Sequence, residues 1–550
     1  MDLCIAIILA VFRMVVIPVQ FEDRALTCTA EELKASVQQA EDYFNSQPGL
    51  NDEYRFDLAT AITLPKPVSY YGANYSDRKD VLLHEAVRYA CTRSGIDFSL
   101  YDNNSDGSVD NVFIITAGFS EADGAGEDWI WPQHGFLKDR GGTIEVGGRT
   151  INSFCVSTEL SSASGETPTK AGIGVFCHEF GHFLGLSDLY DTDGEGSGGL
   201  AKGLWDTGIM DNGCKNAIVP GFCAVDLDIL GTGRPGTLRK GSHTLQPFSR
   251  KGQYLKAAAE GRNEYFLFEC KEGQGLAIYH VDKSGLNAGW SDYYKKDLTA
   301  AERWKHSQVN CRPDRQCAAL LAADPDNGKL FFSSEGRDSF SSDSSPAFRF
   351  WNDSTSTLAL TGIRVNRDGS VSFEVTEPLS ITGTAIFQDA AIISWTVDKG
   401  MGTIEGYDIE YRSQSGSFSA SAPADALSCT LTGLSPHTHY KYTVRAKYSD
   451  GSSASISSSF LTKVYRNDSY PYIYLKGSDR KADGRFEKGA RIPLRVFNAP
   501  KAAEVKWYFN GKRIQTGPDG YYSISEEGTL KAEMLLEDGS TDILIKEVRL

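Results

Sequence analysis

The sequence predicts a multidomain protein, in which a mixed α/β (α+β) domain with a β-rich extension is followed by two all-β sandwich domains. The chain has 550 residues, enough for three or four domains of ordinary size. Strand and helix patterns alternate up to about residue 240, and the helical signals thin out beyond it. We therefore divide the chain into residues 1–240, 241–377, 378–463 and 464–550.

The first domain is predicted to begin with a buried strand and an amphipathic helix. Residues 11–21 are almost continuously apolar, and Thr29 and Glu32 stand in capping-box spacing at the start of a helix. A second helix is expected near residues 77–94, followed by a strand at residues 112–117. The inward faces of the two helices are expected to be Leu33, Val37, Ala40 and Phe44, and Val81, Leu82, Ala86, Tyr89 and Ala90.

The remaining segments are predicted to be strands. In the extension these are residues 265–268, 276–279 and 371–375, and in the next domain 391–395, 406–411 and 440–444. Trp395 in an early strand, and Tyr440 after Leu434-Ser435-Pro436, resemble the fibronectin type III family. The last domain is expected to be an immunoglobulin-like sandwich, with strands at 492–496 and 505–509 and a turn at Asn510-Gly511.

Charge and hydropathy disfavour two classes of partner. The chain has 56 basic and 72 acidic residues and a net charge of −16, which would repel nucleic acid and anionic membrane surfaces. Its longest apolar run, Ile5 to Phe12, has eight residues, whereas a membrane-spanning helix needs about 20. No basic residue precedes that run, so we expect no intact signal peptide in this chain.

One segment carries the signature of a metal-dependent hydrolase. His178 and His182 are four residues apart and lie on one face of a helix, where both imidazoles can reach one zinc ion. Glu179 stands beside them, in position to act on a water molecule. Gly185 can end the helix and turn the chain back, so that Asp188 supplies a third ligand. Three protein ligands leave one position open, which is typical of catalytic zinc.

A methionine in a turn follows, within Trp205-Asp206-Thr207-Gly208-Ile209-Met210. Met210 resembles the Met-turn of metzincins, which packs beneath the metal site. Over residues 13–376 the order of segments resembles the immune inhibitor A-like family of secreted zinc metallopeptidases, through Val15 to Asp23, Asp97 to Asp102, Ile130 to His134, His178 to Tyr190 and Gly275 to Asp282. The resemblance implies a metzincin-like catalytic domain, with Asp188 replacing the third histidine of many metzincins.

A second metal site is predicted in the loop at residues 102–110. Its candidate calcium ligands are spaced at alternate positions, with a glycine at the sixth place, and are Asp102, Asn104, Asp106 and Asp110. Phe113 takes the place of the bidentate glutamate of an EF-hand, so a standard EF-hand is excluded. The alternative is a polar turn without a metal.

Together these features predict a zinc metalloendopeptidase located outside the cytoplasm. It would hydrolyse extracellular proteins by a zinc-activated water, with Glu179 as general base and then acid. The two sandwich domains would attach it to a surface or matrix, or act as spacers. The alternative is a calcium-stabilised adhesion protein with an inactive or structural zinc site. Glu179 favours the enzyme, because a structural site needs no base.

Overall fold

The structure is a computed structural model, and it describes residues 11–550 except 73–78, 162–168, 260, 287, 388, 399–401, 464–471, 474, 476–484, 498–501, 517–519 and 537–540. The predicted start of the chain, Met1 to Ala10, lies outside the described residues. The chain separates into two compact units. The first contains Met1–Ser380, Val397–Glu405 and Val444–Ser458, and the second contains Ile381–Thr396, Gly406–Thr443 and Ser459–Leu550.

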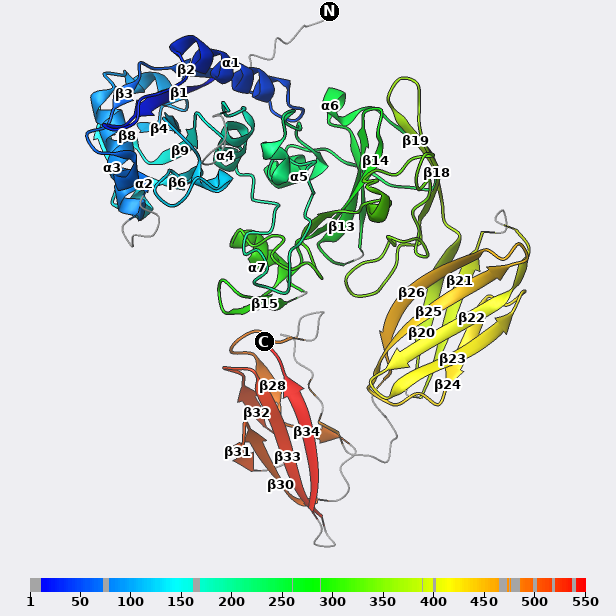
Figure 1. The fold of residues 1–550 in the computed structure, drawn as a ribbon. Helices are drawn as coiled ribbons and strands as arrows, with labels where there is room; N and C mark the ends of the chain where they lie inside the picture. Colours follow the sequence, from blue (N-terminus) through cyan, green and yellow to red (C-terminus); the bar gives the residue numbers. More distant parts are fainter. Residues whose placement is uncertain are drawn as a thin grey trace, which may run out of the picture. The chain divides into compact units, whose positions relative to one another are not determined.

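The first unit begins with a mostly parallel sheet in the order β2-β1-β5-β9-β6, with β3 also paired to β1 (Figure 1). Parallel pairing joins β1 to β2 and β5, and β5 to β9, whereas the edge strand β6 is antiparallel. The strands are β1 Val11–Gln20, β2 Glu53–Leu58, β3 Ile62–Thr63, β5 Val112–Thr116, β6 Gln133–Phe136 and β9 Ser153–Thr158. A small second sheet joins β4 Ser108–Val109, β8 Arg149–Ile151 and β7 Ile144–Val146.

Helices cover both faces of this sheet. Met14 and Val16 of β1 share a core with α1 (Ala30–Ser46) and α4 (Gly174–Leu184). Val15 and Ile17 share another core with α2 (Val68–Gly72) and α3 (Lys79–Arg93). Because successive side chains of a strand point to opposite faces, a strand covered on both faces must be apolar throughout. This accounts for the continuous apolar run that predicts β1.

The two predicted helices of this region differ in how well their buried faces were anticipated. The capping box of Thr29 and Glu32 is present at α1, and all four predicted core residues of α1 are buried. In α3 the buried face includes Leu83 and Val87, which were not predicted, whereas Tyr89 is only half-buried. For Val81 and Leu82, which were also predicted to point inward, the structure describes the helical backbone but not the side chains.

The β-rich extension contains two further sheets, ordered β10-β12-β13-β14-β17 and β11-β19-β18, and the hairpin β15-β16. Their strands are β10 Gly236–Thr237, β11 Gly241–Leu245, β12 Tyr254–Ala258, β13 Glu264–Lys271, β14 Gly275–Asp282, β15 Gly289–Ser291, β16 Lys296–Leu298, β17 Ala318–Leu320, β18 Ala359–Val365 and β19 Val371–Thr376. Three helices accompany them: α5 Ala224–Leu230, α6 Phe248–Lys251 and α7 Ala300–Lys305. Leu267 and Tyr279 belong to the same core as Phe180 of α4, so the extension and the zinc-motif helix share one core.

The next strands form sheets ordered β20-β21-β24 and β23-β22-β25-β26. Trp395 is buried against Tyr407, and the hydroxyl of Tyr440 accepts the N–H of Ser435 at 2.9 Å. This contact is the tyrosine corner of immunoglobulin-like sandwiches. The strands are β20 Leu379–Ile386, β21 Ala390–Val397, β22 Ile404–Ser413, β23 Gly416–Pro423, β24 Ser428–Thr432, β25 His439–Tyr448 and β26 Ser453–Leu461.

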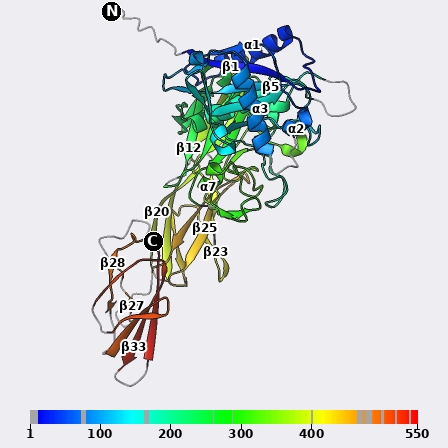
Figure 2. The ribbon, with the colours of Figure 1, turned by 90° about the vertical axis from the view of Figure 1, so that its left-hand side faces the viewer.

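The last strands include the sheet β31-β30-β33-β34, whose strand β33 can be followed in Figure 2. Asn510 and Gly511 have φ of 48° and 77°, as the predicted hairpin turn requires. The strands are β27 Tyr472–Ile473, β28 Arg491–Pro493, β29 Val496–Phe497, β30 Ala502–Phe509, β31 Lys512–Thr516, β32 Tyr521–Ser523, β33 Gly528–Leu536 and β34 Thr541–Val548. Among the described residues, no helix is long and apolar enough to cross a membrane.

Candidate active site

Helix α4 presents the two motif histidines and Glu179 on a buried segment. His178 and Glu179 are 6% and 5% exposed, so both side chains are shielded by the core that surrounds the helix. The helix ends at Gly185, which has a φ of 106° and donates its N–H to His182 O. As predicted, this left-handed residue lets the chain turn back after the second histidine.

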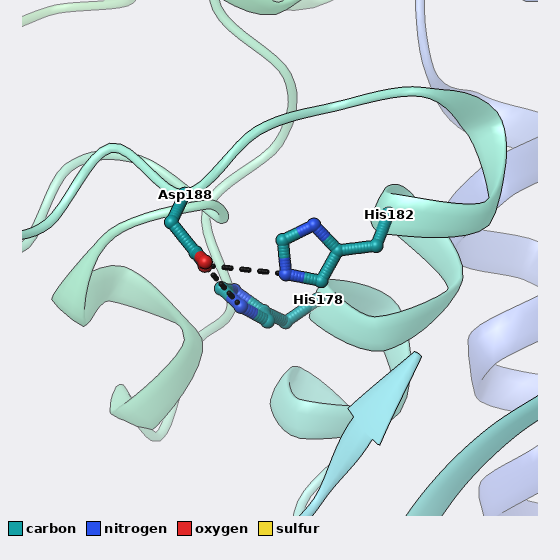
Figure 3. Close-up of side chains that lie close together, drawn as sticks. All are labelled: His178, His182 and Asp188. Atoms are coloured by element: carbon teal, nitrogen blue, oxygen red, sulfur yellow. Dashed lines mark hydrogen bonds and ion pairs between the residues drawn. The ribbon is translucent and has the colours of Figure 1, made fainter. Parts of the chain in front are cut away.

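The return of the chain brings Asp188 to both histidines (Figure 3). Asp188 Oδ1 lies 3.1 Å from His178 Nε2 and 3.2 Å from His182 Nε2. Within the described part of the chain, these three residues form the one group whose possible ligand atoms all lie within 4.8 Å of one another. The three predicted zinc ligands are therefore brought together.

The other ring nitrogen of each histidine faces a backbone carbonyl. His178 Nδ1 lies 3.0 Å from Ile209 O, and His182 Nδ1 lies 2.9 Å from Leu186 O. Because a carbonyl oxygen can only accept, each Nδ1 carries a proton and donates it, which leaves a lone pair on each neutral Nε2. Two imidazole lone pairs and one carboxylate oxygen converge on one point, and this donor set fits zinc.

The three side chains of the cluster shift one another's pKa values. Burial lowers the pKa of His178 and His182, but their contacts with Asp188 outweigh it, and both pKa values are raised. Burial opposes the charge on Asp188, yet the same contacts hold the pKa of its carboxyl below the usual range. The geometry thus favours a positive charge, either a proton or a metal ion, between the three side chains.

Glu179 lies beside this cluster with one free carboxylate oxygen. Its Oε2 is buried and has no hydrogen-bond partner among the described residues. Burial raises the pKa of Glu179, although the two histidines act in the opposite direction. A buried carboxylate oxygen without a partner is costly in a purely structural setting. It is therefore available to a ligand.

A pocket of about 330 Å³ opens over these side chains. Its wall combines α4, the segment that leads into β6 with the first residues of that strand, and the turn after Met210. His134 in this wall contacts Ser153 Oγ at 3.1 Å, and burial lowers its pKa to about 4. The lining includes Trp131, His134, His178, Glu179, His182, Asp188, Tyr190, Asn212 and Lys215.

Met210 packs against α4, the helix that carries the two histidines. It is fully buried, and its Sδ lies 2.7 Å from the position that a Cβ would take on Gly181 of α4. The backbone of the same turn supplies Ile209 O to His178 and Met210 O to the N–H of Leu189 at 2.8 Å. One turn therefore orients the first histidine and holds the segment that carries Asp188.

Residues 19–227 match the model of the immune inhibitor A peptidase M6 catalytic domain, and residues 376–460 match the fibronectin type III domain. The chain carries a peptidase M6 domain. Its relatives include Immune inhibitor A of Bacillus thuringiensis subsp. alesti, at 26% identity over 30% of this chain and 27% of the relative. The pre-pro-metalloprotease PrtV of Vibrio cholerae is 29% identical over 32% of this chain and 21% of the relative. The chain thus matches about a quarter of the length of these relatives.

The fn3 domain of the human collagen alpha-1(XX) chain is 26% identical, covers 17% of this chain and 84% of its own, and has a TM-score of 0.15.

Two polar residues that hold the peptidase M6 site were not anticipated from the sequence. Asp211 is 1% exposed, and its carboxylate accepts the N–H groups of Leu204 and Asn212, both at 2.7 Å. Asn310, in the extension, is fully buried and donates to Leu189 O at 2.7 Å. Asp211 directly follows Met210, which could have drawn attention to it. Nothing in the local sequence marks Asn310.

The predicted calcium ligands are engaged with protein donors. Asp102 Oδ1 and Oδ2 accept the N–H groups of Asp106 and Gly107 at 2.9 and 3.0 Å, and Arg149 Nε lies 2.9 Å from Oδ2. Asp110 Oδ2 accepts from the backbone and side chain of Asn103. Among the described residues, the three aspartates of this loop do not form a group of ligand atoms within 4.8 Å. Asn104 Oδ1 accepts the N–H of Asp106 at 3.0 Å.

Proposed function

We propose that this chain is a secreted zinc-dependent endopeptidase of the metzincin type. The observation that carries the proposal is the convergence of His178, His182 and Asp188 beside the unpartnered carboxylate oxygen of Glu179, within a pocket of the peptidase M6 domain. The packing of Met210 against Gly181 of the histidine-bearing helix supports the metzincin assignment.

In this proposal, His178, His182 and Asp188 hold the zinc ion. When bound, zinc supplies Lewis acidity toward a water molecule and the scissile carbonyl. Glu179 accepts the proton of the attacking water at a carboxylate oxygen and then delivers it to the leaving amine nitrogen. Hydrogen bonds from Nδ1 of both histidines to Ile209 O and Leu186 O keep the rings oriented.

The proposal extends to location, partners and organisation. Extracellular proteins are the proposed substrates, and the sandwich domains are proposed to attach the enzyme to a surface or matrix. We also propose the domain division 1–240, 241–377, 378–463 and 464–550. The fibronectin type III match at residues 376–460 supports the third of these segments.

The test is digestion of casein by the zinc-loaded protein and by its Glu179→Gln variant. Glutamine keeps the shape of the side chain but cannot accept a proton, so we expect cleavage to fall by about 10²–10⁴-fold. Glu195→Gln, on an exposed turn outside the pocket lining, is the matched control. Equal zinc content of all three proteins must accompany the measurement. Casein cleavage by Glu179→Gln at the parent rate contradicts the proposed role of Glu179.

Calcium binding by Asp102, Asn104, Asp106 and Asp110 remains a prediction. The spacing of these oxygen-bearing residues in the sequence supports it, whereas the ion pair of Asp102 with Arg149 competes with a cation. The rival function, a calcium-stabilised adhesion protein, requires calcium here and no hydrolysis. The unpartnered buried oxygen of Glu179 favours the peptidase.

A further inference from the structure

Asn310 links the β-rich extension to the segment that carries the third metal ligand. It lies 121 positions from Leu189 in the sequence, and its side chain is fully buried. A buried amide with no partner would be unfavourable, and the structure shows where each of its groups is used.

The amide of Asn310 is held by β17. Its Oδ1 accepts the N–H of Ala318 at 2.9 Å, and its Nδ2 donates to Ala318 O at 2.6 Å. The second proton of Nδ2 points to Leu189 O at 2.7 Å. Because β17 is itself paired to β14, the direction of this last hydrogen bond is set by the sheet of the extension.

Leu189 is fixed from three sides. Its N–H donates to Met210 O at 2.8 Å, its carbonyl accepts from Asn310, and its side chain is fully buried. Asp188 and Tyr190, the residues on either side of it, both line the pocket. A shift of Leu189 would therefore move the carboxylate of Asp188 relative to the two histidines.

The extension also holds the loop that leads to Met210. Gln316 Oε1 accepts the N–H of Gly203 at 2.7 Å, and the N–H of Leu320 donates to Gly203 O at 2.9 Å. A Cβ on Gly203 would lie 2.1 Å from Leu189 O, so the loop that contains Gly203 and the segment that contains Leu189 are in close contact. Residues 310–320 thus hold both loops around the pocket.

We propose that Asn310 is a positioning residue of the metal site, and that the functional peptidase unit extends at least to residue 320, past the matched region that ends at residue 227. The proposal rests on the proposed zinc site at His178, His182 and Asp188. Asn310 acts through Leu189 and does not touch the metal or the substrate.

The test compares Asn310→Ala and Asn310→Asp with the parent in the full chain. Aspartate keeps the acceptor toward Ala318 N–H but removes both donors. Asn366→Ala is the matched control, because the amide of Asn366 binds Ser370 and Ser372 within the extension and none of the pocket residues. Zinc affinity is measured by competition with a chromophoric chelator, the absorption spectrum of the cobalt form reports the ligand geometry, and apo-protein melting reports the fold.

We expect both Asn310 variants to bind zinc about 10–100-fold more weakly, as is usual when a residue that supports a metal ligand is lost, and to show an altered cobalt spectrum. Asn366→Ala should match the parent in both. Parent-like zinc affinity and cobalt spectrum in either folded Asn310 variant overturn the proposal. This result is distinct from failure of the proposed function, in which the parent binds zinc but Glu179→Gln cleaves casein as the parent does.

Discussion

Two regions of the peptidase domain, the segment from α4 to Asp188 and the loop at residues 102–110, carry candidate ligands at metal-binding spacing. They differ in whether the ligand atoms are free to bind a metal. At α4, the ring nitrogens that face away from the cluster are bonded to carbonyls, and three lone-pair atoms meet at one point. At residues 102–110, the carboxylates already accept backbone N–H groups, and one of them pairs with Arg149. The spacing of residues in a motif identifies candidate metal ligands. Whether their oxygen and nitrogen atoms are free to bind a metal depends on neighbouring residues outside the motif.

The largest effect is expected from the third ligand. Structural zinc sites in zinc-finger peptides bind with about 10–16 kcal/mol shared among their ligands, so loss of one ligand from the proposed site in Asp188→Ala should weaken zinc binding by on the order of 10²–10³-fold. Asp102→Ala, in the other region, should leave zinc affinity unchanged. Chelator competition measures both. Equal zinc loss in the two variants would remove the distinction between the regions.

A smaller effect is expected from the packing of Met210 against Gly181 of α4. A Cβ on Gly181 would lie 2.7 Å from the buried Sδ of Met210. Overpacking costs about 1–3 kcal/mol, and the better helix propensity of alanine offsets about 1 kcal/mol of it. Gly181→Ala should therefore reduce the free energy of unfolding by up to about 2 kcal/mol and weaken zinc binding. Urea unfolding checks the first effect, and an increased midpoint, which is the gain in helix propensity without the clash, would contradict close packing here.

The acidic loop offers the opposite test, in which a variant gains affinity. Arg149 is about a third exposed and pairs with the buried carboxylate of Asp102. Removal of this competing cation by Arg149→Gln should tighten calcium binding by about tenfold, because the charge of the Asp102 carboxylate is then no longer paired with a guanidinium. Calorimetric titration of the zinc-loaded protein measures it, with Arg364→Gln as control. If neither parent nor variant binds calcium, the loop is the polar turn of the alternative interpretation.

The smallest effect is expected at Gly107 in the same loop. Its φ is +91°, and an added Cβ would have no neighbour within 4 Å. Gly107→Ala should therefore destabilise the fold by about 1 kcal/mol through backbone strain alone. Its zinc affinity should equal that of the parent, in contrast with Gly181→Ala. Thermal melting and chelator competition separate the two glycines.

Much of the fold could be predicted because local signals and burial agree. The continuous apolar run of β1 follows from helices on both faces of its sheet, and the capping box at Thr29 begins α1 where expected. The buried face of α3 was less accurate, since Leu83 and Val87 point inward and Tyr89 is half-buried. The helical pattern alone does not determine which of two neighbouring faces of the helix is buried. That is decided by how the helix packs on the sheet.

The sequence by itself determined the candidate metal-binding motif, the turn at Gly185 and the candidate third ligand, because these depend on helix periodicity and on one left-handed residue. Only the tertiary structure decided which oxygens are free and what holds the ligands. Arg149, at the start of β8, reaches Asp102 in the loop before β4, and Asn310 reaches Leu189 from 121 positions away. Hydrogen bonds between segments so distant in sequence leave no local pattern, since any buried polar residue of suitable reach can make them once the sheets have packed.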